Sequence, residues 1–122
     1  MSKISKEQNA QYRQNFLSNH PGYLEAHRKA GRDRIRTRRR VLLVRFGTRC
    51  GHCGFSDSRA LQIDHRNGDG FIERRKYKSS VTFYNMLLKM SEEELHSKYQ
   101  LLCANCNWIK CVENQEHMLR KR

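Results

Sequence analysis

Two pairs of cysteines in this chain have a spacing that suits metal binding. Cys50 and Cys53 form one C-x-x-C motif, and Cys103 and Cys106 form a second. Two thiolates spaced in this way on a turn can bind one ion from the same side, and four sulfurs complete the tetrahedral set that zinc accepts. We therefore predict a structural zinc site closed by these four side chains. The alternatives are two redox motifs or buried free thiols, and the fifth cysteine, Cys111, is expected to have no role.

A second group of residues could perform hydrolysis. Asp64 is a hard oxygen ligand for a divalent cation, and the adjacent His65 can take a proton from water near neutral pH. Asn107 follows the second cysteine motif and offers an amide oxygen; the zinc would bring it close to the Asp-His pair. A metal clamp and a general base are what phosphodiester hydrolysis needs. Spacing alone leaves open the alternative that Asp64 caps a turn and His65 is a surface histidine.

These residues must be positioned by short elements of an α+β domain. Alternation of apolar and polar residues predicts a half-buried strand over 60–64, with a partner over 99–102. On an ideal strand Asp64 and His65 would face opposite sides, so the strand must end or bend there for both to serve one site. Helices are predicted over 81–90, 91–98 and 107–119. The candidate core residues of the last helix are Trp108, Ile109, Val112 and Met118.

The first 48 residues are predicted to form a basic, mostly helical arm. Ser5 and Gln8 form a capping-box pattern that opens a helix to about residue 17, and a second helix is expected over 23–46. Residues 1–49 hold 13 Lys or Arg but only 3 Asp or Glu. Such a density of cations favours contact with phosphates, although a solvated basic face is the alternative. The arginines expected to bind DNA are Arg34, Arg36, Arg38, Arg39 and Arg40.

Composition limits the class of protein. The 122 residues carry a net charge of +13 and only 37% hydrophobic residues, which predicts one small domain with a thin core and a polyanionic partner. No apolar run is long enough to cross a membrane. The N-terminal MSKISKEQNA lacks the apolar segment of a signal peptide. A reducing cytoplasm is therefore expected, where cysteines more often bind metals than form disulfides.

Three segments of the sequence together resemble the motifs of a known family. The strings CGHCG, LQIDHRNGDG and YQLLCANCNWIK resemble the HNH endonuclease family in its branch with a four-cysteine zinc site. The resemblance covers about residues 49–114 and leaves out the basic arm. It implies the ββα-metal fold, which is a two-stranded hairpin and a helix around one catalytic divalent ion. The expected domains are thus a DNA-binding arm over 1–48 and a zinc-stapled nuclease domain over 49–122.

The resemblance also implies residue roles. His65 would be the general base, Asp64 and Asn107 would bind the catalytic ion, and Lys110 would contact a phosphate. The middle Asn of the family motif has no direct match, and Asn85 and Asn67 are the two candidates for its place.

The expected activity is hydrolysis of double-stranded DNA with magnesium, manganese or nickel, leaving a 5′-phosphate, by a monomer or weak homodimer. Such small nucleases often belong to phages or mobile elements, where they serve in homing, packaging or restriction. The alternative is a zinc-stapled nucleic-acid-binding module without cleavage activity. A structural RNA-binding zinc protein is less favoured, since only 9% of the residues are aromatic.

Overall fold

The computed structural model describes residues 3–77 and 79–119. The chain divides into two compact units that meet in the sequence between Arg34 and Ile35. This boundary lies within a helix and earlier than the domain boundary expected at residue 48. The C-terminal part of the expected arm thus belongs to the same unit as the cysteines.

The N-terminal unit contains helix α1, Lys6–Asn19, and the first part of helix α2, Tyr23–Arg45. The predicted capping box is confirmed, since the side chains of Ser5 and Gln8 each accept a hydrogen bond from the backbone N–H of the other. No described residue of this unit is buried. Its helices are therefore stabilised by local contacts, such as the stacking of Phe16 on His20 with ring centroids 4.1 Å apart.

The C-terminal unit is built on a two-stranded sheet. A short 3-10 helix, η1 (Ser58–Ala60), leads into strand β1, Leu61–His65, which pairs antiparallel with β2, Tyr99–Cys103. Leu61 lies opposite Cys103, and His65 lies opposite Tyr99. The predicted strand pair is confirmed within one residue at each end. Mixed α and β structure, mostly helical with a small sheet, is thus established.

Five helices follow β1 in the described part of the chain. Three lie between the strands, and Ser79 and Ser91 accept hydrogen bonds from backbone N–H groups as N-caps of the second and third. Two more helices follow β2. Their bounds are α3 (Gly70–Lys76), α4 (Ser80–Lys89), α5 (Glu92–Lys98), α6 (Ala104–Glu113) and α7 (Glu116–Leu119). Among the described residues no helix has the length and apolar character needed to span a bilayer.

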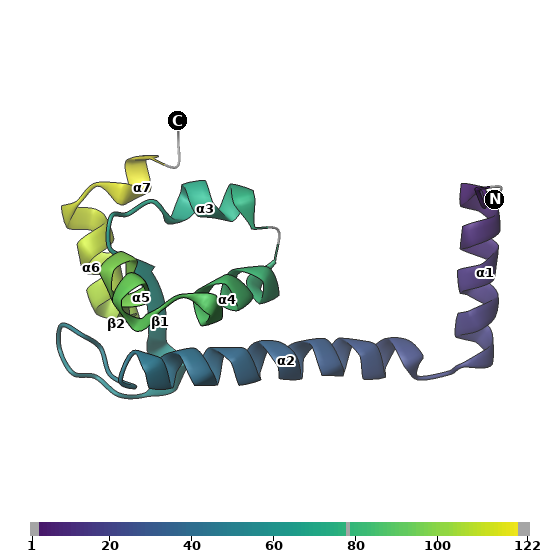
Figure 1. Cartoon of the computed structure of the whole chain (residues 1–122), viewed down its shortest axis with the longest axis horizontal. Helices are drawn as coiled ribbons and strands as arrows, with labels where there is room; N and C mark the ends of the chain where they lie inside the picture. The colour runs from purple at the N-terminus through teal and green to yellow at the C-terminus, as the bar shows by residue number, and fades with distance from the viewer. Residues whose placement is uncertain (1–2, 78, 120–122) are drawn as a thin grey trace. The chain divides into compact units, whose positions relative to one another are not determined.

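The two faces of the sheet are covered differently. Figure 1 shows the end of α2 together with α4, α5 and α6 around the strands. Leu42 of α2, Leu87 of α4 and Leu95 of α5 are fully buried and form one cluster with Tyr99 of β2. Helix α6 packs against both strands, where its polar side chains meet Gln62 and Asp64. Alternation along β1 therefore directs its odd-numbered residues to the apolar core and its even-numbered residues to α6.

The prediction for the C-terminal helix was wrong in two respects. It is not continuous, since α6 ends at Glu113 and Gln115 adopts a positive φ of 56° before α7. The expected core residues Trp108, Ile109, Val112 and Met118 are all exposed. The physical reason is that α6 turns its polar face, with Asn107 and Lys110, toward polar side chains of β1.

Candidate functional site

The four predicted cysteine ligands come together. The sulfurs of Cys50, Cys53, Cys103 and Cys106 all lie within 4.8 Å of one another, and this is the one such group of Cys, His, Asp or Glu side chains among the described residues. Backbone turns shape the first motif. Cys50 N–H donates to Phe55 O, and Gly54 N–H donates to Cys50 O. The backbone of Gly54 has a φ of +79°, which glycine adopts without steric cost. The cluster is one that could hold a metal ion.

The spacing of the sulfurs in the cluster fits zinc. A tetrahedron with Zn–S bonds of about 2.3 Å has sulfur–sulfur edges of about 3.8 Å. Cys53 Sγ lies 3.7 Å from Cys103 Sγ. Burial raises the pKa of the Cys50 thiol, but hydrogen bonds from backbone groups of Cys53, Cys103 and His52 outweigh this and lower the pKa to about 6. Burial and the hydrogen bonds with the other three sulfurs raise the pKa of Cys106 to about 12. A thiolate is the form that binds metal.

A cleft of about 790 Å³ lies at the end of β1 and brings the predicted catalytic residues together. Asp64, His65 and Asn107 all line it. Because β1 ends at His65, the cleft reaches side chains from both faces of the strand. The two side chains nevertheless leave the strand on opposite faces, Asp64 toward Lys110 of α6 and His65 toward Phe83 of α4.

Asp64 is buried, with 7% of its surface exposed, and its carboxylate charge is stabilised by polar partners. Gln100 Nε2 donates to Asp64 Oδ2 at 2.8 Å, and Lys110 Nζ lies 3.3 Å from the same oxygen. Lys110 also donates to His65 O at 3.1 Å and forms an ion pair with Glu116. Burial alone would lower the pKa of Lys110, but Glu116 and Asp64 raise it above the ordinary 10.5. The predicted phosphate ligand is thus paired inside the protein.

His65 is held by a second carboxylate. Its Nε2 lies 2.7 Å from Glu73 Oε2, on helix α3. The hydroxyl of Tyr99 donates to both oxygens of Glu73 at 2.8 Å. The imidazole also stacks on Phe83, with centroids 5.6 Å apart. Sequence reasoning missed Glu73 and Tyr99, and the one available signal was an acidic residue eight positions after His65.

Asn107 is oriented so that its oxygen can serve as a ligand. Its Nδ2 donates to Gln62 Oε1 at 2.6 Å, which leaves the amide Oδ1 as the atom for a cation. Asp64 and Asn107 together offer two hard oxygens. Magnesium is commonly held by one or two protein oxygens and several waters, and both residues carry oxygens of the type that it prefers.

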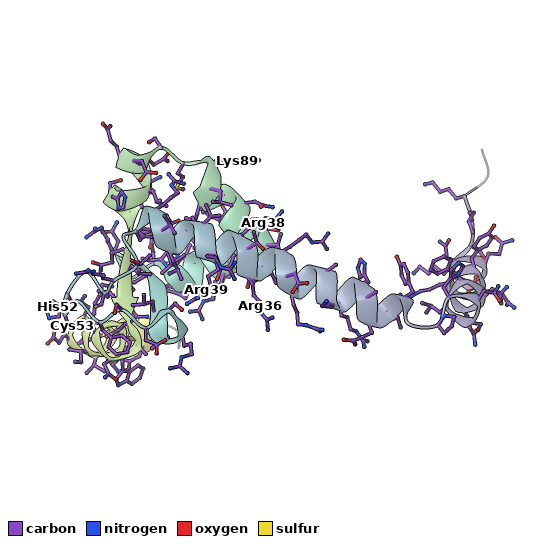
Figure 2. All side chains as sticks on the ribbon, turned by 90° about the horizontal axis from the view of Figure 1, so that it is seen from below. Arg36, Arg38, Arg39, His52, Cys53 and Lys89 are labelled. Atoms are coloured by element: carbon purple, nitrogen blue, oxygen red, sulfur yellow. The ribbon has the colours of Figure 1, made fainter. Side chains whose placement is uncertain are left out.

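The predicted DNA-binding arginines of the C-terminal unit fall into two groups, one hydrogen-bonded to other parts of the protein and one exposed to solvent. Arg38 Nε donates to Asn85 Oδ1 at 2.6 Å, and Arg39 donates to the backbone oxygens of Ser58 and Leu61 at 2.7 Å each. In Figure 2, Arg38 lies on the side of α2 toward α4, whereas Arg36 points away from it. The side chains of Arg36 and Arg40 are exposed. Arg34, also exposed, belongs to the N-terminal unit.

Arg66 makes the contacts that tie the start of the inter-strand connection to its end. Its Nε donates to His96 O at 2.7 Å and to Tyr99 O at 3.1 Å, and its backbone N–H donates to Lys98 O. Asn85, one of the two asparagines considered for the middle position of the motif, instead accepts the hydrogen bond from Arg38.

Comparisons of the chain with protein-family models, with curated proteins and with solved structures gave no match. A proposal for the function therefore rests on the geometry of the site.

Proposed function

We propose that the protein is an endonuclease of the HNH type that hydrolyses double-stranded DNA, with a structural zinc and one catalytic divalent ion. The single observation that carries the proposal is the shared cleft of Asp64, His65 and Asn107. An oxygen donor set, a histidine base and a surface rich in cations are the parts that phosphodiester hydrolysis requires.

The residues have distinct tasks in this reaction. Asp64 and Asn107 would hold a divalent ion, which would supply charge stabilisation for the phosphate and the leaving oxygen. His65 accepts a proton from water while the water oxygen forms a bond to phosphorus. The bond from phosphorus to the 3′ oxygen breaks, and that oxygen takes up a proton from solvent. The products are a 5′-phosphate and a 3′-hydroxyl.

The four-cysteine cluster has a structural task. Zinc held by Cys50, Cys53, Cys103 and Cys106 has no open position for substrate, so it would stabilise the fold and not perform chemistry. The four cysteines lie in the turn before β1 and at the start of α6, so a zinc held there would link that turn to the helix that carries Asn107 and Lys110. The exposed arginines of α2 would bind DNA phosphates.

One observation favours a second candidate, a zinc-stapled module that binds nucleic acid without cutting it. Lys110 already neutralises Asp64, so a divalent ion must displace an ammonium group to bind there. In a binding module this pair would be permanent.

Cleavage of supercoiled plasmid separates the two candidates. The zinc-loaded protein is incubated with plasmid and no added divalent ion, or with magnesium, manganese or nickel. We expect nicked or linear product only with an added ion. The His65→Ala variant should cut about 10²–10⁴-fold more slowly with DNA affinity retained. His96→Ala, which changes an exposed histidine of α5, is the matched control and should cut normally. A wild type that binds plasmid but cuts with none of these ions supports the binding module.

A further inference from the structure

The imidazole of His65 is held by contacts with Glu73, Tyr99 and Phe83. Its side chain is only 16% exposed, and that of Glu73 only 23%. The rings of Tyr99 and His65 form a T-shaped contact with centroids 5.0 Å apart, and Phe83 stacks on the imidazole. The ring is thus held in one orientation by contacts from α3, α4 and β2.

The hydrogen bonds at Glu73 determine which imidazole nitrogen carries a proton. Tyr99 is buried, and burial together with the Glu73 carboxylate raises the pKa of its hydroxyl above the ordinary range. The hydroxyl therefore remains a donor and both oxygens of Glu73 act as acceptors. A carboxylate has no proton to give, so the bond to His65 requires a proton on Nε2. In the neutral ring, Nδ1 is then the nitrogen with the free electron pair.

Space beside Nδ1 comes from a glycine. A Cβ placed on Gly70, the first residue of α3, would lie 3.0 Å from His65 Nδ1 and 3.3 Å from Cε1. Contacts that short force a neighbour to move. Gly70 also lines the cleft together with Asp64. The missing side chain therefore keeps Nδ1 uncrowded on the side of the cleft.

We propose that Glu73, held by Tyr99, is the positioning residue that makes Nδ1 of His65 the proton-accepting atom. This rests on the proposed nuclease function and deepens it. During the reaction a water proton passes to Nδ1, the water oxygen bonds to phosphorus, the P–O bond to the 3′ oxygen breaks, and that oxygen is protonated by solvent. The Glu73 carboxylate keeps accepting the hydrogen bond from Nε2 and stabilises the imidazolium that forms, as a carboxylate does behind a catalytic histidine.

The test combines kinetics with a spectroscopic readout. Glu73→Gln keeps the shape of the side chain but offers an amide to Nε2. We expect kcat for plasmid cleavage to fall about 10²-fold or more with KM nearly unchanged, because Glu73 orients the base and has no assigned part in binding the phosphate. The ¹⁵N NMR signals of His65, recorded without DNA at a pH where the ring is neutral, should show the Nε2–H tautomer in wild type and a mixed population in the variant. Glu93→Gln, at an exposed position of α5, is the matched control and should match wild type in both measurements.

Gly70→Ala is a second variant that leaves Glu73 intact. It should lower kcat while His65 keeps the Nε2–H tautomer, since the added methyl group crowds Nδ1 and not Nε2. A His65 in the Nδ1–H tautomer in wild type, or an unchanged kcat in Glu73→Gln, would overturn the positioning role. A wild type that cuts no DNA refutes the proposed function, and the NMR signals then still decide whether Glu73 sets the tautomer.

Discussion

Replacing Lys110 by Met should destabilise the protein strongly, because this lysine is the cation for two carboxylates. Its side chain is 16% exposed, and those of Asp64 and Glu116 are 8% and 15% exposed. Removing one partner of a buried ion pair typically costs about 3–5 kcal/mol, because a charge is left without compensation. The hydrogen bond from Gln100 still satisfies part of Asp64, so we expect a destabilisation near the lower end, about 3 kcal/mol.

The assay is thermal or urea unfolding of zinc-loaded protein without other divalent ions. A destabilisation of about 3 kcal/mol corresponds to a fall of about 12 °C or more in melting temperature for a domain of this size. The control is Lys89→Met, which removes an exposed lysine of α4 and should change stability little. The pKa of Lys110 is raised by its partners, so its contribution is present below the ordinary lysine pKa of 10.5 and is lost as the pH rises through the higher folded value.

Magnesium extends the experiment to the proposed catalytic ion. If Asp64 is a ligand, the ion can replace the missing ammonium charge in Lys110→Met. At a concentration about ten times its dissociation constant, it should return about 1.4 kcal/mol of stability. Equal stability of the Lys110 and Lys89 variants would refute the reasoning about the ion pair, and a Lys110 variant insensitive to magnesium would argue against Asp64 as a ligand.

Three further outcomes follow from the site. Metal analysis should find one zinc per chain; Cys50→Ser should lose the zinc and unfold, whereas Cys111→Ala should keep it, because Cys111 lies outside the cluster. Removing the exposed Arg36 and Arg40 together should weaken DNA binding for all sequences and flatten its salt dependence by about one unit of log–log slope for each phosphate that is no longer bound; an unchanged slope would exclude backbone contact. Arg39→Met should lower the melting temperature, because two backbone oxygens lose their donor, and calorimetry against Arg36→Met measures the difference.

Local signals in the sequence were enough to predict several of the elements. The capping box of Ser5 and Gln8 forms between residues three positions apart, so the local sequence is enough to predict it. The alternation that predicted β1 arises because one face of the strand is buried. The cysteine spacing likewise predicted the four-sulfur cluster, because a shared ion requires convergence. These features depend on residues a few positions apart or on one strong chemical constraint.

The partners inside the cleft could not be predicted in this way. Lys110 and Asp64 are far apart in the sequence, and their pairing depends on which face α6 turns toward the sheet. The apolar residues of α6 suggested the opposite orientation, and Trp108 is in fact 60% exposed. Glu73 reaches His65 only because the connection after β1 turns back as α3. Polar pairing across tertiary contacts leaves no periodic trace in the sequence.

The wide separation of the two cysteine motifs has a consequence for folding. An ion that joins Cys50 and Cys103 closes a loop that contains β1, all three inter-strand helices and β2. Closing a loop of this length in an unfolded chain costs about 4 kcal/mol of chain entropy, by the relation that holds for covalent cross-links. A metal ion that binds early in folding would remove much of this entropy cost from the later steps. Without the ion, the sheet would form slowly, because its two strands are distant in the sequence. Metal supply would then set both the rate at which the cleft assembles and the fraction of chains in which it exists.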